Sequence, residues 1–184
     1  LYRKGINYSG INDSQNTPSI STSTWHSMKA DNENISNQKA MERGQSYGWG
    51  KIFEAGAAAK AAGGFENLGQ NSKGIQALDQ GIHALQDAIA HRGTDMANHS
   101  VPNEMSPSPR DFSAAFSITE NAIVLTEVMG GNYNNLGNGL SLNFEGMSSS
   151  QLKSAISGLL KGMETNNIGI INLELGKNEQ VLTR

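Results

Sequence analysis

Residues 73–92 read KGIQALDQGIHALQDAIAHR, and the spacing of apolar residues in this stretch predicts an amphipathic helix. The branched apolar side chains recur at alternating spacings of three and four residues, which brings them all onto one face of a helix. They are Ile75, Leu78, Ile82, Leu85 and Ile89. Gly93 follows as a helix-stop signal. We therefore predict a helix over residues 73–92 that packs one face into a core.

The opposite face of this helix carries His83, Asp87 and His91 at four-residue intervals. Four residues raise a helix by about 6 Å, so the column spans about 12 Å between its outer Cα atoms. Neighbouring members of the column can share a metal ion, but His83 and His91 are too far apart to hold one ion comfortably. We predict a metal-binding face with Asp87 in the middle. Either its two oxygens bridge two ions, each bound by one outer histidine, or one outer histidine does not bind the metal and contacts a ligand instead.

The alternative interpretation is a solvated polar face with no ligand. The composition of the helix argues against it, because no Lys, Arg or Glu occurs between Gly74 and Ala90. A helix face in solvent usually carries such long charged residues. Buried His and Asp side chains need partners, and a metal ion supplies them. We therefore expect this helix to be buried on both sides.

Composition limits the chemistry of any site. The 184 residues suffice for one domain, and the chain has no cysteine, so a metal site must use histidine and carboxylate ligands. The formal net charge is −3 and the Lys and Arg residues form no basic stripe, which argues against tight electrostatic binding of long duplexes. No apolar run approaches transmembrane length. Because the sequence starts at Leu1 rather than Met, we expect a processed or shortened piece of a longer protein.

A helical body is predicted between an N-terminal arm and a small extension. Residues 1–24 are polar and are predicted to be an irregular arm, followed by loop or short helix around Trp25 and His26. Residues 37–62 have a helical composition. Their glycines either let a second helix approach closely or break the helix in two: Gly44, Gly48, Gly50 and Gly56. A further helix is predicted over residues 111–129.

The last part of the chain changes character. Residues 140–144 alternate apolar and polar residues, as a strand does, and residues 168–175 also have the composition of a strand. A helix over residues 148–163 separates them. The predicted fold class is mainly α. A helical body over residues 25–130 is followed by a small C-terminal β-α-β (α+β) extension over residues 139–184, all in a single domain 1–184.

The segment GIHALQDAIAH (Gly81–His91) resembles the H-x-x-x-D helix of the zinc-dependent phospholipase C family, which is similar in fold to the single-strand-specific zinc nucleases. It resembles more closely the ALH-x-x-QD-x-x-AH helix of metallohydrolase domains at the C-termini of Rhs-type polymorphic toxins. The resemblance is specific over about a dozen residues and loose over residues 25–130. It implies a mainly helical metallohydrolase-like body, a zinc cluster between helices, secretion or delivery into a target cell, and a cognate immunity protein as partner.

The resemblance also implies ligands. His83 and Asp87 match the family's H-x-x-x-D, with Asp87 as bridging ligand, and His91 matches the toxin variant. His26 is the candidate upstream ligand and His99 the candidate downstream ligand. All four histidines of the chain would then serve one metal site.

The chain departs from the phospholipases, which have a later H-x-x-x-E pair, because no histidine follows His99. Glu120 or Glu127 would supply a carboxylate alone, so one to three zinc ions are all consistent with the sequence. Both glutamates lie near Phe112 and Phe116 on the predicted helix, where partial burial would suit a ligand or general base. The other interpretation places them at the boundary with solvent.

Asp31 and Asp95 are either extra ligands or ordinary loop residues. The predicted activity is zinc-dependent hydrolysis of a phosphodiester, with Asp87 and Glu120 as catalytic residues. The substrate is a phospholipid or a nucleic acid, and the missing basic patch favours a phospholipid-like or small phosphodiester.

Two other functions stay open. Arg3, the segment Ser21-Thr22-Ser23 and Glu179 occur in the order found in ADP-ribosyltransferases, namely an arginine strand, an S-T-S strand and a catalytic glutamate. A domain of that kind would consume NAD. The other possibility is a non-catalytic, toxin-associated binding domain whose histidine column is structural.

Overall fold

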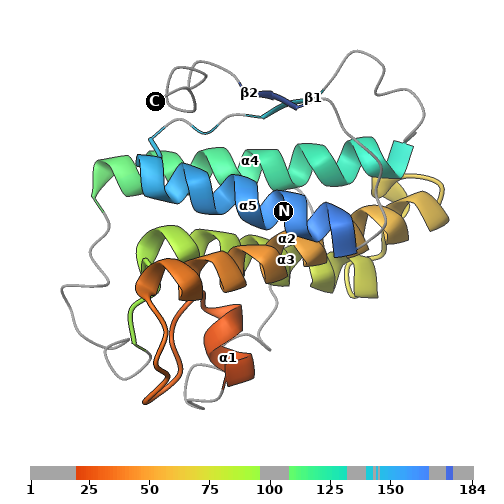
Figure 1. The fold of residues 1–184 in the computed structure, drawn as a ribbon. Coiled ribbons are helices and arrows are strands. Elements are labelled where there is room, and N and C mark those ends of the chain that lie inside the picture. The colour runs from red at the N-terminus through yellow and green to blue at the C-terminus, as the bar shows by residue number, and fades with distance from the viewer. Residues whose placement is uncertain are drawn as a thin grey trace.

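The computed structural model describes residues 20–95, 108–131, 140–142, 144, 146–165 and 173–175. This part of the chain is mainly α-helical, as predicted (Figure 1). Its long helices are α2 (Asn37–Ala61), α3 (Lys73–Ala90), α4 (Pro109–Gly131) and α5 (Ser149–Thr165). A short helix α1 (Ile20–Trp25) precedes them, and a 3-10 helix η3 (Phe65–Asn67) lies between α2 and α3.

A serine precedes each long helix and caps its first turn; these residues are Ser36, Ser72, Ser108 and Ser148. Two of the caps are reciprocal. Asp111 N donates to Ser108 Oγ at 3.2 Å, while Ser108 N donates to Asp111 Oδ2 at 3.0 Å. In the same way, Gln151 N donates to Ser148 Oγ at 3.3 Å, while Ser148 N donates to Gln151 Oε1 at 2.8 Å. Such capping boxes satisfy amides that have no partner inside the helix, so the sequence itself sets where α4 and α5 begin.

Helix α2 is the central element and packs against α3, α4 and α5. Two of its four glycines, Gly48 and Gly56, allow α3 and α4 to approach closely, which is the first of the two predicted roles, and α2 is unbroken. A Cβ added at Gly48 would lie 3.0 Å from the carbonyl oxygen of Gly81 on α3, so these helices cross with their backbones nearly in contact. On the other side, a Cβ at Gly158 of α5 would lie 2.8 Å from the carbonyl carbon of Gln45.

One hydrophobic cluster joins the four long helices. It holds Trp49 and Phe53 of α2, the inner faces of α4 and α5, and the predicted apolar stripe of α3 except Ile75, which packs in a second, smaller cluster. Trp49 satisfies its indole by donating Nε1–H to the carbonyl of Ala155, at 3.0 Å. No residue between Gly74 and His91 is fully exposed: the apolar face of α3 is buried, and its polar face, which includes His83 and Asp87, is partly buried, so the prediction of burial on both sides holds only in part.

The helices α2, α4 and α5 begin at the same end of the bundle, and α3 runs the opposite way and ends there (Figure 1). The two three-residue strands β1 (Leu140–Leu142) and β2 (Leu173–Leu175) pair in parallel, with Leu140 opposite Leu173. Helix α5 lies between them in the chain. No helix among the described residues is long and apolar enough to span a membrane.

The prediction of an irregular arm over residues 1–24 is wrong for residues 20–24, which belong to helix α1. Serine and threonine dominate this segment and favour helices only weakly, so the sequence predicts loop. Contacts of α1 with α2 and α3 stabilise the helix instead. Residues 1–19 lie outside the described part of the chain.

Candidate metal centre

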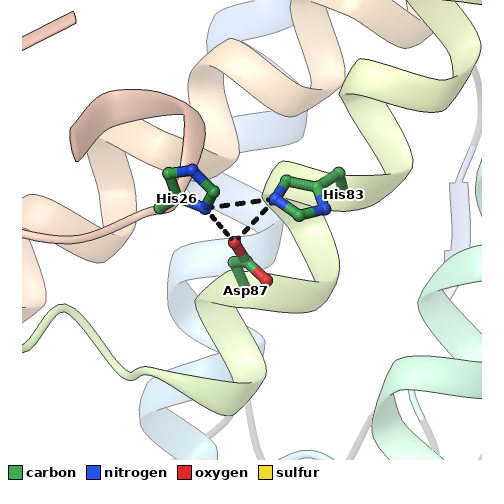
Figure 2. Close-up of side chains that lie close together, drawn as sticks. All are labelled: His26, His83 and Asp87. Atoms are coloured by element: carbon green, nitrogen blue, oxygen red, sulfur yellow. Dashed lines mark hydrogen bonds and ion pairs between the residues drawn. The ribbon is translucent and has the colours of Figure 1, made fainter. Parts of the chain in front are cut away.

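Three donor atoms from two distant parts of the chain converge beside α3 (Figure 2). His26 Nδ1 lies 2.7 Å from Asp87 Oδ2 and 3.1 Å from His83 Nε2. His83 Nε2 lies 3.1 Å from the same oxygen of Asp87. The three atoms therefore form a small triangle in which each atom faces the other two.

The loop after α1 places His26 in this triangle. The next residue, Ser27, has a positive φ of 52°, which is uncommon for a residue with a side chain. Its hydroxyl donates to the carbonyl of Ala84 at 2.6 Å, directly beside His83 in the chain. Ser27 also packs on α2 at Gly44, where an added Cβ would lie 1.9 Å from Ser27 Oγ. Ser27, the residue next to His26, thus contacts both α2 and α3.

Arg43 on α2 stabilises the same loop through hydrogen bonds. Its Nη2 donates to the carbonyl of Met28 and to Glu33 Oε2, each at 2.9 Å, and its Nη1 contacts Glu33 Oε1. Glu33 in turn accepts a hydrogen bond from Ala30 N at 2.9 Å. The hydrogen bond from Arg43 is the main reason that the pKa of Glu33 lies below its usual range.

The electrostatics of the triangle keep Asp87 charged. Burial alone would raise the pKa of Asp87, but hydrogen bonds from His26 and His83 and the nearby imidazoles hold it far below its usual range. Burial lowers the pKa of His83, and the hydrogen bond and charge of Asp87, with the charge of Asp79, outweigh that effect and raise it. His26 is fully buried, and only 14% of the Asp87 side chain is exposed. A charged carboxylate with so little solvent needs strong partners.

His91 approaches the other oxygen of Asp87. Its Nε2 lies 3.6 Å from Asp87 Oδ1, and its side chain is 8% exposed. The described histidines therefore surround Asp87, with His26 and His83 at one oxygen and His91 at the second. This matches the predicted central position of Asp87 in the column.

Asp79 extends the column by one turn and was not singled out from the sequence. It precedes His83 by four residues on α3 and is half-buried. Burial raises its pKa, and the charge of His83 offsets only part of that effect. The signal in the sequence is the same four-residue spacing, continued toward the N-terminus of α3 (Asp79, His83, Asp87, His91).

The predicted carboxylates outside α3 do not join the group of donor atoms. Glu120 and Glu127 are exposed on α4, so the partial burial that would suit a general base or ligand is missing. Helix α4 buries residues such as Ile118 and Leu125 and leaves Phe112 and Phe116 exposed, so the face that carries these aromatic residues is in solvent.

Asp95 is engaged in an ion pair with Lys29 at 3.3 Å, and Asp31 is exposed. Ser21 lies in α1, so the strand that the transferase interpretation needs at Ser21-Thr22-Ser23 is a helix. His99, Arg3 and Glu179 lie outside the described residues.

The donor set fits a transition metal. Catalytic zinc sites combine two histidines and a carboxylate with an open fourth position, at about 2.0–2.2 Å from the metal. Donors at that distance stand about 3.3 Å apart around a tetrahedral ion, and the three observed separations are 2.7, 3.1 and 3.1 Å. Small outward shifts of His26 and His83 would complete the match.

Comparisons with known protein families, curated proteins and solved structures find no match to this chain. The case for a metal centre therefore rests on the geometry of His26, His83 and Asp87 and on the chemistry of their donor atoms.

Proposed function

We propose that this chain is a metal-dependent hydrolase in which His26, His83 and Asp87 hold one zinc ion. The observation that carries the proposal is the convergence of two imidazole nitrogens and one carboxylate oxygen within 3.1 Å of one another beside a buried helix. When bound, zinc lowers the pKa of a water ligand and stabilises negative charge on the substrate.

The surrounding residues have separate roles in this proposal. His91, at the second oxygen of Asp87, orients the carboxylate or serves a second ion. Asp79 serves as the general base in this proposal, because it is half-buried on α3 with a raised pKa. Asp79 also acts electrostatically on His83 and so tunes the basicity of one ligand.

The substrate and biological role in this proposal rest on the resemblance of Gly81–His91 to zinc phospholipases C and toxin metallohydrolases. The proposed substrate is a phosphodiester, from a phospholipid or a nucleic acid. The proposed role is that of a secreted or delivered bacterial toxin domain with an immunity protein as partner. The net charge of −3 favours a small phosphodiester over a long duplex.

One observation favours a second candidate. Two histidines and one carboxylate on one face of an octahedral ion also bind non-haem iron(II), and donors at about 2.1 Å from such an ion stand about 3.0 Å apart. The observed separations of 2.7–3.1 Å match this spacing as well. Iron in this site would support oxygen chemistry rather than hydrolysis.

Elemental analysis of the purified chain, coupled to hydrolysis of bis(4-nitrophenyl) phosphate, tests the proposal. We expect about one zinc per chain and a metal-dependent hydrolysis that His26→Ala and Asp87→Asn each reduce by at least 100-fold. Asp95→Asn is the matched control, because Asp95 pairs with Lys29 outside the site. Iron as the bound metal would support the second candidate. Unchanged activity of Asp87→Asn would overturn the proposed role of the metal site, and absence of both bound metal and hydrolysis in wild type would favour a non-catalytic binding domain.

A further inference from the structure

A second polar site lies at the end of the bundle where α2, α4 and α5 begin and α3 ends. A cavity of about 380 Å³ opens there, within the size range of small-molecule pockets. Its wall includes Gln38 of α2, Arg110 and Asp111 of α4, Ser150 of α5, and Arg92, which follows α3. None of the residues that line it belongs to the triangle of His26, His83 and Asp87.

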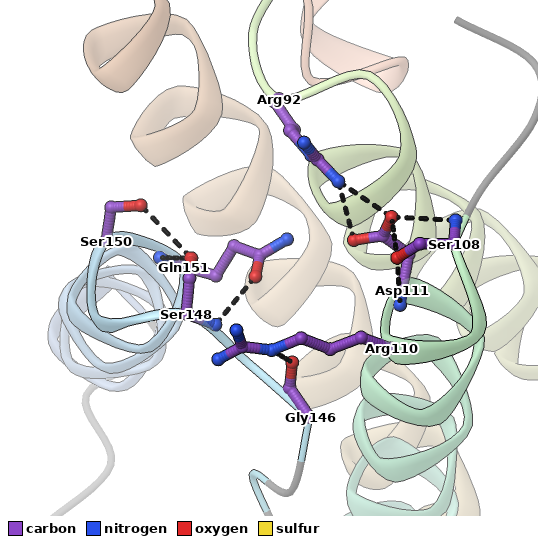
Figure 3. Close-up of polar contacts among 8 residues, drawn as sticks. All are labelled: Arg92, Ser108, Arg110, Asp111, Gly146, Ser148, Ser150 and Gln151. Carbon is purple, nitrogen blue, oxygen red and sulfur yellow. Dashed lines mark hydrogen bonds and ion pairs between the residues drawn. The ribbon is translucent and has the colours of Figure 1, made fainter.

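Arg110 brings a positive charge that no described carboxylate balances (Figure 3). Its Nε donates to the carbonyl of Gly146 at 2.8 Å and its Nη2 to the carbonyl of Met147 at 3.0 Å. These neutral acceptors fix the guanidinium in place but do not neutralise its charge. A guanidinium has five N–H donors, so three remain for a ligand.

The other charges in the wall nearly cancel. Arg92 Nη2 donates to both oxygens of Asp111, at 2.8 and 2.7 Å, and Asp111 also accepts from Ser108 N and Oγ. Burial opposes ionisation of Asp111, and the bonds from Ser108 and Arg92 outweigh it and lower the pKa of the carboxyl. Two arginines and one aspartate leave the wall at +1, in a chain whose formal net charge is −3.

The helices around the cavity reinforce this positive potential. Gln38, Arg110 and Ser150 lie in the first turns of α2, α4 and α5. A helix N-terminus carries the equivalent of about half a positive charge, and three such ends meet here against the single C-terminal end of α3, which carries the opposite partial charge. Ser148 and Ser150, whose hydroxyl oxygens lie 3.2 Å apart, add hydrogen-bonding groups beside Arg110.

We propose that this cavity binds an oxyanion of the phosphate class, either free phosphate or the phosphoryl group of a small phosphorylated molecule. Arg110 is the main cationic ligand, because its charge has no carboxylate partner among the described residues. Arg92 offers its remaining N–H groups from the rim, where its side chain is 59% exposed. A guanidinium fork matches the geometry of phosphate oxygens better than an ammonium group does. The proposal is independent of the metal site.

Isothermal titration with inorganic phosphate, at constant ionic strength set with sodium chloride, tests this site on the full chain. We expect saturable binding that Arg110→Gln weakens by at least tenfold. The control is Lys153→Gln, which removes an exposed cation from α5 outside the cavity and should leave the affinity unchanged. Asp87→Asn should also bind phosphate normally, and this outcome separates the cavity from the metal centre.

Arg110 also links α4 to the segment before α5, so its loss could unfold the protein for other reasons. Arg92→Gln is therefore a second variant, expected to weaken binding by a smaller factor while circular dichroism shows a folded chain. Ribose 5-phosphate in place of phosphate distinguishes the two sources: tighter binding points to a phosphorylated molecule, equal binding to free phosphate. Unchanged affinity of folded Arg110→Gln, or no saturable binding by wild type up to tens of millimolar phosphate, overturns the proposal.

Discussion

His26 Nδ1 lies 2.7 Å from Asp87 Oδ2, although 61 residues separate them in the chain. The contact links the loop after α1 to the last turn of α3, so metal binding and folding should be coupled at this point. A ligand that binds only the folded state stabilises it, by about 2.7 kcal/mol when free ligand is 100 times Kd.

We therefore predict that zinc raises the melting temperature of the wild-type chain and has little effect on Asp87→Asn. The asparagine keeps the size of the side chain but removes the charge that the metal needs. Thermal unfolding followed by circular dichroism, with and without zinc, measures both shifts. Equal stabilisation of the two proteins would mean that zinc binds elsewhere.

Zinc affinity should fall as the pH is lowered, and the fall should begin above the pH expected for an ordinary histidine. The reason is that the pKa of His83 is raised, so protons compete with the metal at higher pH, with up to a tenfold loss of affinity per pH unit below that pKa. Asp79→Asn removes one of the charges that raise this pKa. We expect that variant to hold zinc to a lower pH than wild type.

Competition titrations with a chromophoric chelator between pH 5 and 8 measure this dependence. The control variant is Asp95→Asn, whose carboxylate lies in an ion pair with Lys29. A profile for Asp79→Asn that coincides with wild type would remove Asp79 from the electrostatics of the site.

The match between sequence and structure is closest where the interactions are local. Alternating spacings of three and four residues predict α3 and its buried stripe, because a helix brings such residues together whatever surrounds it. The same regularity predicts that Asp87 is central to the histidine column. The position of Asp79 follows from that spacing as well, although Asp79 precedes the first histidine of the column.

Features that depend on tertiary packing were harder to predict. The position of His26 depends on the positive φ of Ser27 and on the missing side chain of Gly44, which are on different elements. Hydrophobicity alone does not identify the buried face of α4, because Phe112 and Phe116 are strongly apolar, yet they are 63% and 66% exposed. Smaller residues such as Ala114 and Ala122 fill the interior there instead, since α2 and α3 pack closely against α4.

Gly44→Ala should damage the metal centre without touching a ligand. The new methyl group would lie 1.9 Å from Ser27 Oγ and 2.4 Å from Ser27 Cα, so the loop that carries His26 must move. Overpacking of this kind costs about 1–3 kcal/mol. We expect lower stability in chemical denaturation and weaker zinc binding.

Gly50→Ala is the matched control on the same helix, because nothing lies within 4 Å of a Cβ at that position. Alanine favours a helix over glycine by about 1 kcal/mol, so this variant should be more stable than wild type and bind zinc normally. A stabilising effect of Gly44→Ala would contradict the packing described for Ser27.

Asp111 should contribute stability that is lost in acid. Because its pKa in the folded state is lowered, ionised Asp111 stabilises the fold at pH values above the ordinary pKa of about 4. That contribution falls as the pH drops from there through the lowered pKa, where the unfolded chain binds the proton first. Asp111→Asn lacks the contribution, and we expect it to be less stable than wild type by about 1–2 kcal/mol at pH 7. The figure is modest because its partner Arg92 is largely in solvent.

Urea denaturation at pH 7 and at pH 3 measures the two free energies of unfolding. The difference between wild type and Asp111→Asn should shrink at the lower pH, because protonated Asp111 loses its advantage there. Glu54→Gln, which alters an exposed ion pair with Lys51, should change stability little at either pH. A constant difference between wild type and Asp111→Asn would mean that the capping bonds with Ser108, rather than the charge of Asp111, stabilise the start of α4.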